Sequence, residues 1–182
     1  MFKQNILTAT PCDGTNCDGF YRGTANLGWA DSKMIVIDYE MQPDPQNLPA
    51  IWALNGQVVR AAQYGCNCRG MGGAGGCGEI DIAETLVANS PQAISEIYSF
   101  KGATGLGNNN WFPRTGDRMT IGVIFDVKTD QISILHLTDF DYTQTQLTRS
   151  LIDGYLQAPS FDMVFGSSSR RRSEHPFLKR HH

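Results

Sequence analysis

The sequence predicts an all-β fold. Short segments rich in β-branched and aromatic residues recur along the chain, separated by Gly, Pro and Asn, whereas the spacing of an amphipathic helix is scarce. The chain holds 19 glycines among 182 residues, and 10% of its residues are aromatic, a composition that suits a turn-rich β protein. Short strands with turns at this spacing indicate two packed sheets in a single domain, as in a sandwich or jelly roll.

The first two strands are expected in residues 34–41 and 49–54. Residues 34–41 are rich in β-branched side chains and are followed by Pro43, which stops a strand. Residues 49–54 are largely apolar and end at Asn55 and Gly56, a pair typical of a tight turn.

Four further strands are expected after that turn. Residues 78–87 contain a short acidic motif, and residues 93–100 alternate well enough to lie beside them. Residues 119–127 and 131–137 flank a three-residue turn and predict a hairpin. Weaker strand patterns lie at residues 150–156 and 161–165, and a Gly- and Asn-rich loop is expected at residues 102–110.

Three segments are expected along the chain. Residues 1–19 form an N-terminal cysteine-containing segment, residues 20–166 an incomplete sandwich domain, and residues 167–182 a disordered basic tail. The tail carries five Lys or Arg and one Glu, so the rest of the chain holds 10 basic and 17 acidic residues. An acidic body argues against nucleic acid as a partner, and no apolar run approaches the roughly 20 residues needed to cross a bilayer.

The chain contains five cysteines in two clusters: Cys12, Cys17, Cys66, Cys68 and Cys77. They predict local disulfides formed in an oxidising compartment, with one thiol left unpaired or paired outside the chain. Three zinc ligands at Cys66, Cys68 and Cys77 are the alternative, but the spacing is unusual and no His lies nearby, so no metal or cofactor is expected. Because residues 1–5 lack the apolar core of a signal peptide, the chain is expected to begin inside a longer protein.

The acidic motif, at residues 78–84, places three carboxylates within six residues of an otherwise buried strand. Glu79 and Asp81 would point to one face, since side chains alternate along a strand. Glu84 would face the other way unless a β-bulge near Ile82 inserts one extra residue. Like charges this close repel one another, and catalysis is the commonest reason for a protein to keep them together.

An edge strand with a charged outer face is the alternative interpretation, because charge prevents edge-to-edge pairing. Such a face normally carries Lys, Thr or mixed charges. Here the Gly-rich segment 70–78 precedes the motif and Thr85-Leu86-Val87 follows it, which favours a strand inside a sheet.

Residues 78–84 resemble the active-site signature of glycoside hydrolase family 16, the laminarinase and lichenase group, in those members whose strand carries a bulge. Residues 48–54 are similar to the strand that precedes it in that family, although Leu48 stands where an aromatic residue is usual.

A narrower resemblance is to a fungal cell-wall branch of glucan hydrolases related to the yeast target-of-SBF protein. It is carried by the cysteine spacing before Gly78 and by the segments 111–114 and 119–126. The resemblance as a whole covers residues 20–166.

This resemblance implies a concanavalin-like β-jelly roll of two curved antiparallel sheets, with the acidic strand across a glycan-binding cleft. Glu79 would be the nucleophile, Glu84 the general acid/base, and Asp81 the residue that tunes Glu79. A retaining glycosidase needs such a pair of carboxyl groups, about 5–5.5 Å apart. Since like charges resist simultaneous ionisation, we expect the pKa of Glu84 to be raised.

Aromatic side chains are expected beside the acids, because sugar rings have apolar faces. Trp52 is the first candidate, Trp111 and Phe112 are the second, and Tyr64 is the third. Trp52 lies in an apolar strand and could equally belong to the core, whereas packing explains Trp111 less well because a loop is expected there. His136 is expected to be an ordinary strand residue.

The sequence therefore predicts a retaining glycoside hydrolase or transglycosylase of the endo-β-1,3-glucanase type, acting on β-glucan of the cell wall. The protein would be extracellular and monomeric. One alternative is a non-catalytic glucan-binding or structural wall protein on the same fold. Another is an inactive fragment of the enzyme, because domains of this family are usually longer and the strand-like sequence stops near residue 166.

Overall fold

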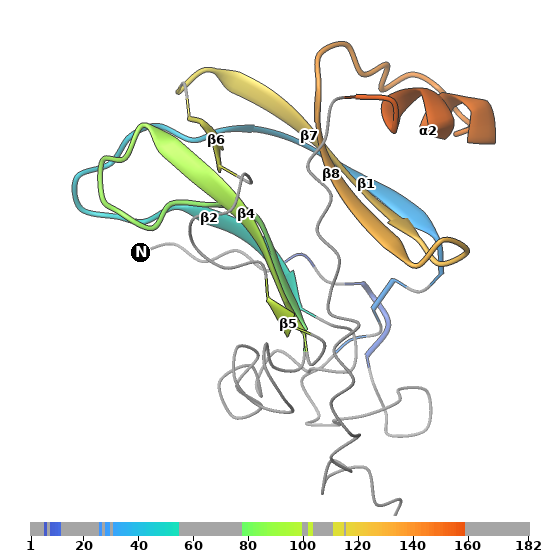
Figure 1. Cartoon of the computed structure of the whole chain (residues 1–182), viewed down its shortest axis with the longest axis horizontal. Coiled ribbons are helices and arrows are strands. Elements are labelled where there is room, and N and C mark those ends of the chain that lie inside the picture. The colour runs from blue at the N-terminus through green and yellow to red at the C-terminus, as the bar shows by residue number, and fades with distance from the viewer. Residues whose placement is uncertain are drawn as a thin grey trace, which may run out of the picture.

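The computed structural model describes residues 6, 8–11, 26, 28–29, 31–54, 78–99, 102–103, 111–114 and 116–158. Within these residues it contains eight β-strands, β1 to β8, and one α-helix, α2 (Figure 1). The prediction of an all-β fold is confirmed: the described strands form two antiparallel sheets and no closed barrel.

The first sheet has the strand order β1-β7-β8. β1 (Lys33–Glu40) pairs with β7 (Arg118–Asp126), which in turn pairs with β8 (Gln131–Leu137). The β7–β8 connection is the predicted hairpin. Asp130 in its turn has a φ of 55°, a left-handed conformation that Asp tolerates better than most residues.

The second sheet has the strand order β2-β3-β4-β5, with β6 also paired to β4. The strands are β2 (Ala50–Leu54), β3 (Glu79–Glu84), β4 (Gln92–Ser99), β5 (Gly102–Ala103) and β6 (Trp111–Pro113). β3 carries the acidic motif and has a hydrogen-bonded neighbour on each side. It is therefore a central strand, which removes the edge-strand interpretation.

The two sheets pack against each other through apolar side chains. The buried cluster between them consists of Met41, Ile80, Ile82, Ala83, Ile121 and Val123. Ile80 comes from β3, whereas Ile121 and Val123 come from β7 and are 0% exposed. Full burial of one such side chain contributes about 1.5–3 kcal/mol to stability. One face of β3 is thus committed to the core, which leaves its other face for the acids.

Helix α2 (Arg149–Tyr155) replaces the strand predicted at residues 150–156, so that prediction is wrong. Leu151, Ile152 and Tyr155 are spaced at i, i+1 and i+4, a helical pattern, and the Thr148 side chain caps the helix by accepting a hydrogen bond from the Leu151 backbone N–H. Figure 1 shows α2 beside the first sheet. An ion pair joins α2 to β7, with 2.9 Å between Arg149 Nη1 and Asp126 Oδ2.

Several predicted features lie outside the described residues. They are Tyr64, the five cysteines, the segment 161–165 and the basic tail 167–182. The disulfides and the three-segment division of the chain stay predictions. Among the residues that are described, no helix has both the length and the apolarity that a membrane crossing requires.

Candidate functional site

The β-bulge predicted in the acidic strand is present. Between β2 and β3, Ile51 lies opposite Ala83 and Trp52 lies opposite Asp81, so Ile82 is the extra residue. The pairing of β3 with β4 shifts over the same stretch. The irregularity thus belongs to β3 itself, as the odd spacing of the motif predicts.

The bulge changes which side chains share a face. Ile82 and Ala83 both join the core cluster, although side chains of adjacent residues normally point to opposite faces. Glu84 consequently returns to the face that carries Glu79 and Asp81. The register on both sides supports this assignment, since Asp81 and Glu84 each have a cross-strand partner on β2 and on β4.

Ser95 of β4 holds the bulge. Its Oγ atom donates a hydrogen bond of 2.6 Å to the backbone oxygen of Ile82. Ser95 lies between Glu96, which is opposite Asp81, and Ile94, which is opposite Glu84. The serine therefore satisfies a carbonyl group at the point where the ladder is irregular.

A third acid meets the motif from the neighbouring strand. Asp81, Glu84 and Glu96 each place one carboxylate oxygen within 4.8 Å of the other two. Asp81 and Glu96 are each 2% exposed, and Glu84 is partly buried. Hard oxygen atoms at this separation could share one proton or hold one small cation.

Sequence reasoning missed Glu96. The alternation in residues 93–100 predicted a strand beside the acidic one, but not which residue would lie opposite Asp81. In the structure Glu96 is that residue, and its Oε2 atom accepts a hydrogen bond of 2.7 Å from the Tyr98 hydroxyl. Tyr98 in turn lies opposite Glu79, so β4 lines the whole acidic face.

Glu79, Asp81 and Glu84 are thus brought to one face, as the proposed mechanism requires. Glu79 is 7% exposed and lies between Leu54 of β2 and Tyr98 of β4. The acidic side chains on this face of the second sheet are thus largely buried. The individual roles of the three acids stay predictions.

The aromatic candidates divide between the two faces of this sheet. Trp52 lies opposite Asp81 and so shares the acidic face. Trp111 lies opposite Ile94, itself the partner of Glu84, which places it on the same face. Trp111 belongs to strand β6 rather than to the expected loop.

Phe112 occupies the opposite face. It lies across from Ala93 and packs against the core. Its ring meets the His136 ring edge to face, with 4.7 Å between the centroids. Although His136 is exposed by its accessible surface, partial desolvation of its ring lowers its pKa below the ordinary value of 6.5. A contact between Phe112 and substrate stays a prediction, whereas its packing with His136 is direct.

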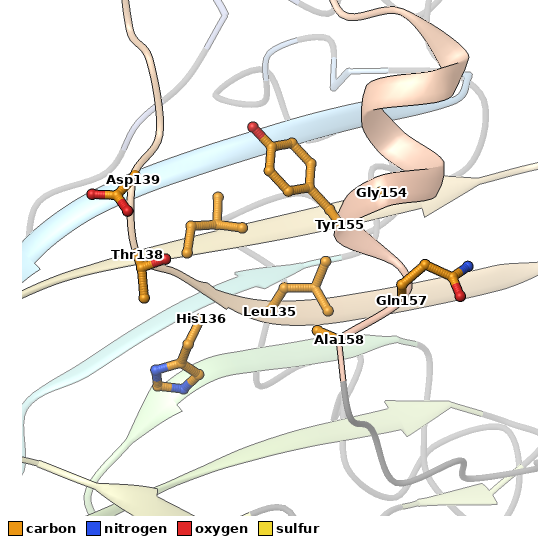
Figure 2. A pocket seen from close by; sticks show the side chains of 9 residues that line it. Leu135, His136, Thr138, Asp139, Gly154, Tyr155, Gln157 and Ala158 are labelled. Atoms are coloured by element: carbon orange, nitrogen blue, oxygen red, sulfur yellow. The ribbon is translucent and has the colours of Figure 1, made fainter.

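Two hollows described on the first sheet lie apart from the acids. A groove of about 370 Å³ runs between β8 and the end of α2, lined by Leu135, Leu137, Thr138, Asp139, Tyr155 and Gln157 among others. Figure 2 shows Tyr155 and His136 on opposite sides of β8. The groove is therefore formed where α2 meets β8 of the first sheet.

The second hollow, of about 200 Å³, is lined by Asp38, Tyr39, Glu40 and Arg118. Arg118 forms an ion pair with Asp38, with 2.7 Å between Nη2 and Oδ2. The hydrogen bond from Arg118 holds the pKa of Asp38 below its ordinary value. Asp38 and Arg118 satisfy each other, which suits a structural role.

Comparison with known proteins places the chain in a family. It matches the family model described as "Cell wall protein YJL171C/Tos1, C-terminal" over residues 3–154. It is 32% identical over 173 residues to a Schizosaccharomyces pombe protein named "Probable circularly permuted 1,3-beta-glucanase". The aligned region covers 85% of this chain and 32% of that relative.

Two further relatives carry the name "Probable circularly permuted 1,3-beta-glucanase TOS1". The Saccharomyces cerevisiae protein is 34% identical over 167 residues, covering 83% of this chain and 34% of the relative. The Candida albicans protein is 30% identical over 170 residues, and the aligned region covers 84% of this chain and 35% of that relative. The chain spans about a third of the length of the curated relatives it matches. No solved structure matches it.

Proposed function

Because this chain belongs to the C-terminal family of the cell wall proteins YJL171C and Tos1, we propose that it acts on β-glucan of the cell wall as a retaining glycoside hydrolase or transglycosylase. The observation that carries the proposal is the bulge in β3, which gives Glu79, Asp81 and Glu84 a common face. The names of the relatives support β-1,3-glucan as the substrate. The motif at residues 78–84 supports a mechanism like that of glycoside hydrolase family 16.

In this mechanism Glu79 attacks the anomeric carbon and the glycosidic bond breaks. Glu84 gives its proton to the leaving oxygen and later removes a proton from water or from a sugar hydroxyl. The second attack releases the sugar from Glu79. Asp81 lies between them in the motif, where its charge orients Glu79 and resists ionisation of Glu84.

Trp52 and Trp111 are proposed to hold the sugar units. Both share the acidic face, one on each side of the acidic strand. An aromatic ring offers an apolar surface that matches the C–H face of a pyranose. Phe112 and Tyr64 remain weaker candidates, the first because it packs against His136.

A non-catalytic glucan-binding role is the second candidate. The observation that favours it is the burial of the acids, with Asp81 at 2% and Glu79 at 7% exposure. The chain also spans only about a third of the relatives' length, so glucan binding and turnover are measured side by side on the same purified protein.

The decisive experiment incubates that protein with a laminari-oligosaccharide and follows the products. Shorter products than the input indicate hydrolysis, and longer ones indicate transfer. We expect Glu79→Gln and Glu84→Gln to lower turnover by about 10²–10⁴-fold. Glu40→Gln is the matched control, because Glu40 is exposed on the other sheet. A parent that binds glucan without turnover would establish the second candidate instead.

A further inference from the structure

The groove between β8 and α2 is a hollow that the proposed mechanism does not use. Its volume of about 370 Å³ lies within the range of small-ligand sites, roughly 300–1,000 Å³. Its lining comes from the first sheet and from α2, whereas the acids belong to the second sheet. A ligand held in this groove would therefore bind apart from the acidic face.

The two ends of the groove are polar. Figure 2 shows Thr138 and Asp139 at one end and Gln157 at the other, with Leu135 and Tyr155 between them. The side chains of Thr138, Asp139 and Gln157 are exposed and form no hydrogen bond or ion pair within the described ranges of the chain. A hydroxyl, a carboxylate and an amide are thus available to a ligand, and the Tyr155 ring offers an apolar surface beside them.

Gly154 leaves open space along the α2 side of the groove. It lies in the last turn of α2, although glycine destabilises a helix relative to alanine. Its φ is not positive, and a Cβ atom added to it would meet no atom within 4 Å. Neither the backbone conformation nor close packing therefore requires glycine here. Since Gly154 lines the groove, the space that it leaves for a ligand is the best explanation for the missing side chain.

Two further aromatic rings extend the apolar surface beyond Tyr155. The centroid of the Phe140 ring lies 6.3 Å from that of the Tyr155 ring, and the centroid of the Tyr142 ring lies 4.9 Å from that of Phe140. Tyr142 is 57% exposed, although burial of an aromatic side chain would stabilise the fold. An aromatic surface that continues out of the groove suits a linear ligand of several rings.

The charge of the groove favours a neutral ligand. Among the described residues that line it, Asp139 is the one carboxylate and none is Lys or Arg. Arg149, the only cation of α2, is already paired with Asp126 and Asp153. An anionic ligand such as a phosphate ester would therefore meet repulsion and no counter-charge. A chain of neutral sugars avoids both, because its hydroxyls can bond to the polar ends while its C–H faces lie on an aromatic ring.

We propose that this groove is a second carbohydrate-binding site, which holds a chain of neutral sugars with one ring against Tyr155 and hydroxyls bonded to Asp139 and Gln157. The assignment of the sugar as β-glucan rests on the function proposed above. A wall glucan bound in the groove would anchor the protein and leave the acidic face open to a second segment of glucan.

The test is a fluorine-19 NMR titration of fluorotyrosine-labelled protein with a laminari-oligosaccharide, in a Glu79→Gln background that should prevent turnover. The Tyr155 signal, assigned by its loss in Tyr155→Phe, should shift and saturate as the sugar binds. Gly154→Gln places a side chain in the open space and should raise the dissociation constant read from that signal about tenfold. Its melting temperature should not fall, because glutamine is the better helix former.

A matched pair of variants tests the polar end of the groove. Gln157→Ala should raise the dissociation constant about threefold, the expected effect of losing one hydrogen bond. Gln131→Ala is the control, since Gln131 is exposed at the opposite end of β8, and it should leave the constant unchanged. Equal constants in these two variants would remove Gln157 from the site and contradict the proposed contact.

The remaining outcomes separate this inference from its alternatives. A Tyr155 signal that does not move with the sugar, or an equal dissociation constant in Gly154→Gln, would overturn it. A dimer that Gly154→Gln splits into monomers, measured by light scattering, would assign the groove to a second copy of the chain and also overturn it. Saturable binding at Tyr155 in a protein without glucan turnover would keep the inference and defeat the catalytic function. Turnover by the unsubstituted protein with an unmoved Tyr155 signal would do the reverse.

Discussion

Ser95 donates a hydrogen bond of 2.6 Å from its Oγ atom to the backbone oxygen of Ile82, the extra residue of the bulge in β3. One hydroxyl on β4 thus fixes the irregularity that gives the acids of β3 a common face. The shape of the site therefore depends on a residue that carries no charge and takes no part in the proposed reaction.

Ser95→Ala should lower the free energy of unfolding by about 1–3 kcal/mol, because it leaves a buried carbonyl group unsatisfied. Urea denaturation measures the change. Ser90→Ala is the control, since Ser90 bonds to the Gln92 carbonyl at 2.9 Å in an exposed turn, and it should cost about 0.5 kcal/mol or less. Equal losses in the two variants would show that Ser95 does not hold the bulge.

Trp52→Ala should raise KM for glucan about tenfold with a smaller effect on kcat, which corresponds to about 1.4 kcal/mol of lost binding. The reason is its place opposite Asp81 on the acidic face. Trp52→Phe, which keeps an aromatic surface, should lose less. Trp29 is 56% exposed, so Trp29→Ala serves as the control. A KM unchanged by Trp52→Ala would assign this tryptophan to packing alone.

His136 should make stability fall as the pH is lowered. Partial desolvation holds its pKa in the folded state below 6.5, so the unfolded chain binds more protons between the two pKa values. The contribution of neutral His136 to the free energy of unfolding is complete above pH 6.5 and is lost as the pH falls towards the folded-state pKa. Melting temperatures of the parent and of His136→Asn, compared from about pH 7.5 to 5, measure it. The melting temperature of the parent should fall more than that of the variant as the pH is lowered. Parallel curves of melting temperature against pH would contradict this.

Val123→Ala should cost about 2 kcal/mol, from roughly 0.8 kcal/mol for each buried methylene and a further cost for the cavity. Val123 is 0% exposed in the core between the sheets. Val127 follows the same strand and is 68% exposed, so Val127→Ala is a matched control expected within about 0.5 kcal/mol of the parent. Denaturant midpoints compare the two. A larger loss of unfolding free energy in Val127→Ala than in Val123→Ala would contradict the location of the core between the two sheets.

Much of the fold follows from local sequence. The predicted strands at residues 34–41, 49–54, 78–87, 119–127 and 131–137 correspond to β1, β2, β3, β7 and β8. The bulge was also predictable, because three acids share one face only if Glu84 regains the face of Asp81. These features depend on the alternation within single segments.

The features that sequence reasoning missed depend on pairing or on very short elements. Glu96 joins the acids only because it lies opposite Asp81, and cross-strand register cannot be read from one strand. Trp111 lies in a three-residue strand that exists through its pairing with β4. Helix α2 has seven residues, too few for a strong periodic pattern, and is held by its cap and the contact between Arg149 and Asp126.

The alternation of acidic and apolar residues along β3 has a consequence for folding. If β3 paired with its neighbours one residue out of register, Glu79 and Asp81 would turn towards the apolar layer and Ile80 towards the acidic side. Burying charges there is so costly that such a misaligned sheet would be rejected as it forms. The carboxylates therefore also disfavour incorrect strand registers during folding. Replacing them with apolar residues would relieve their repulsion, yet it would let misaligned chains accumulate.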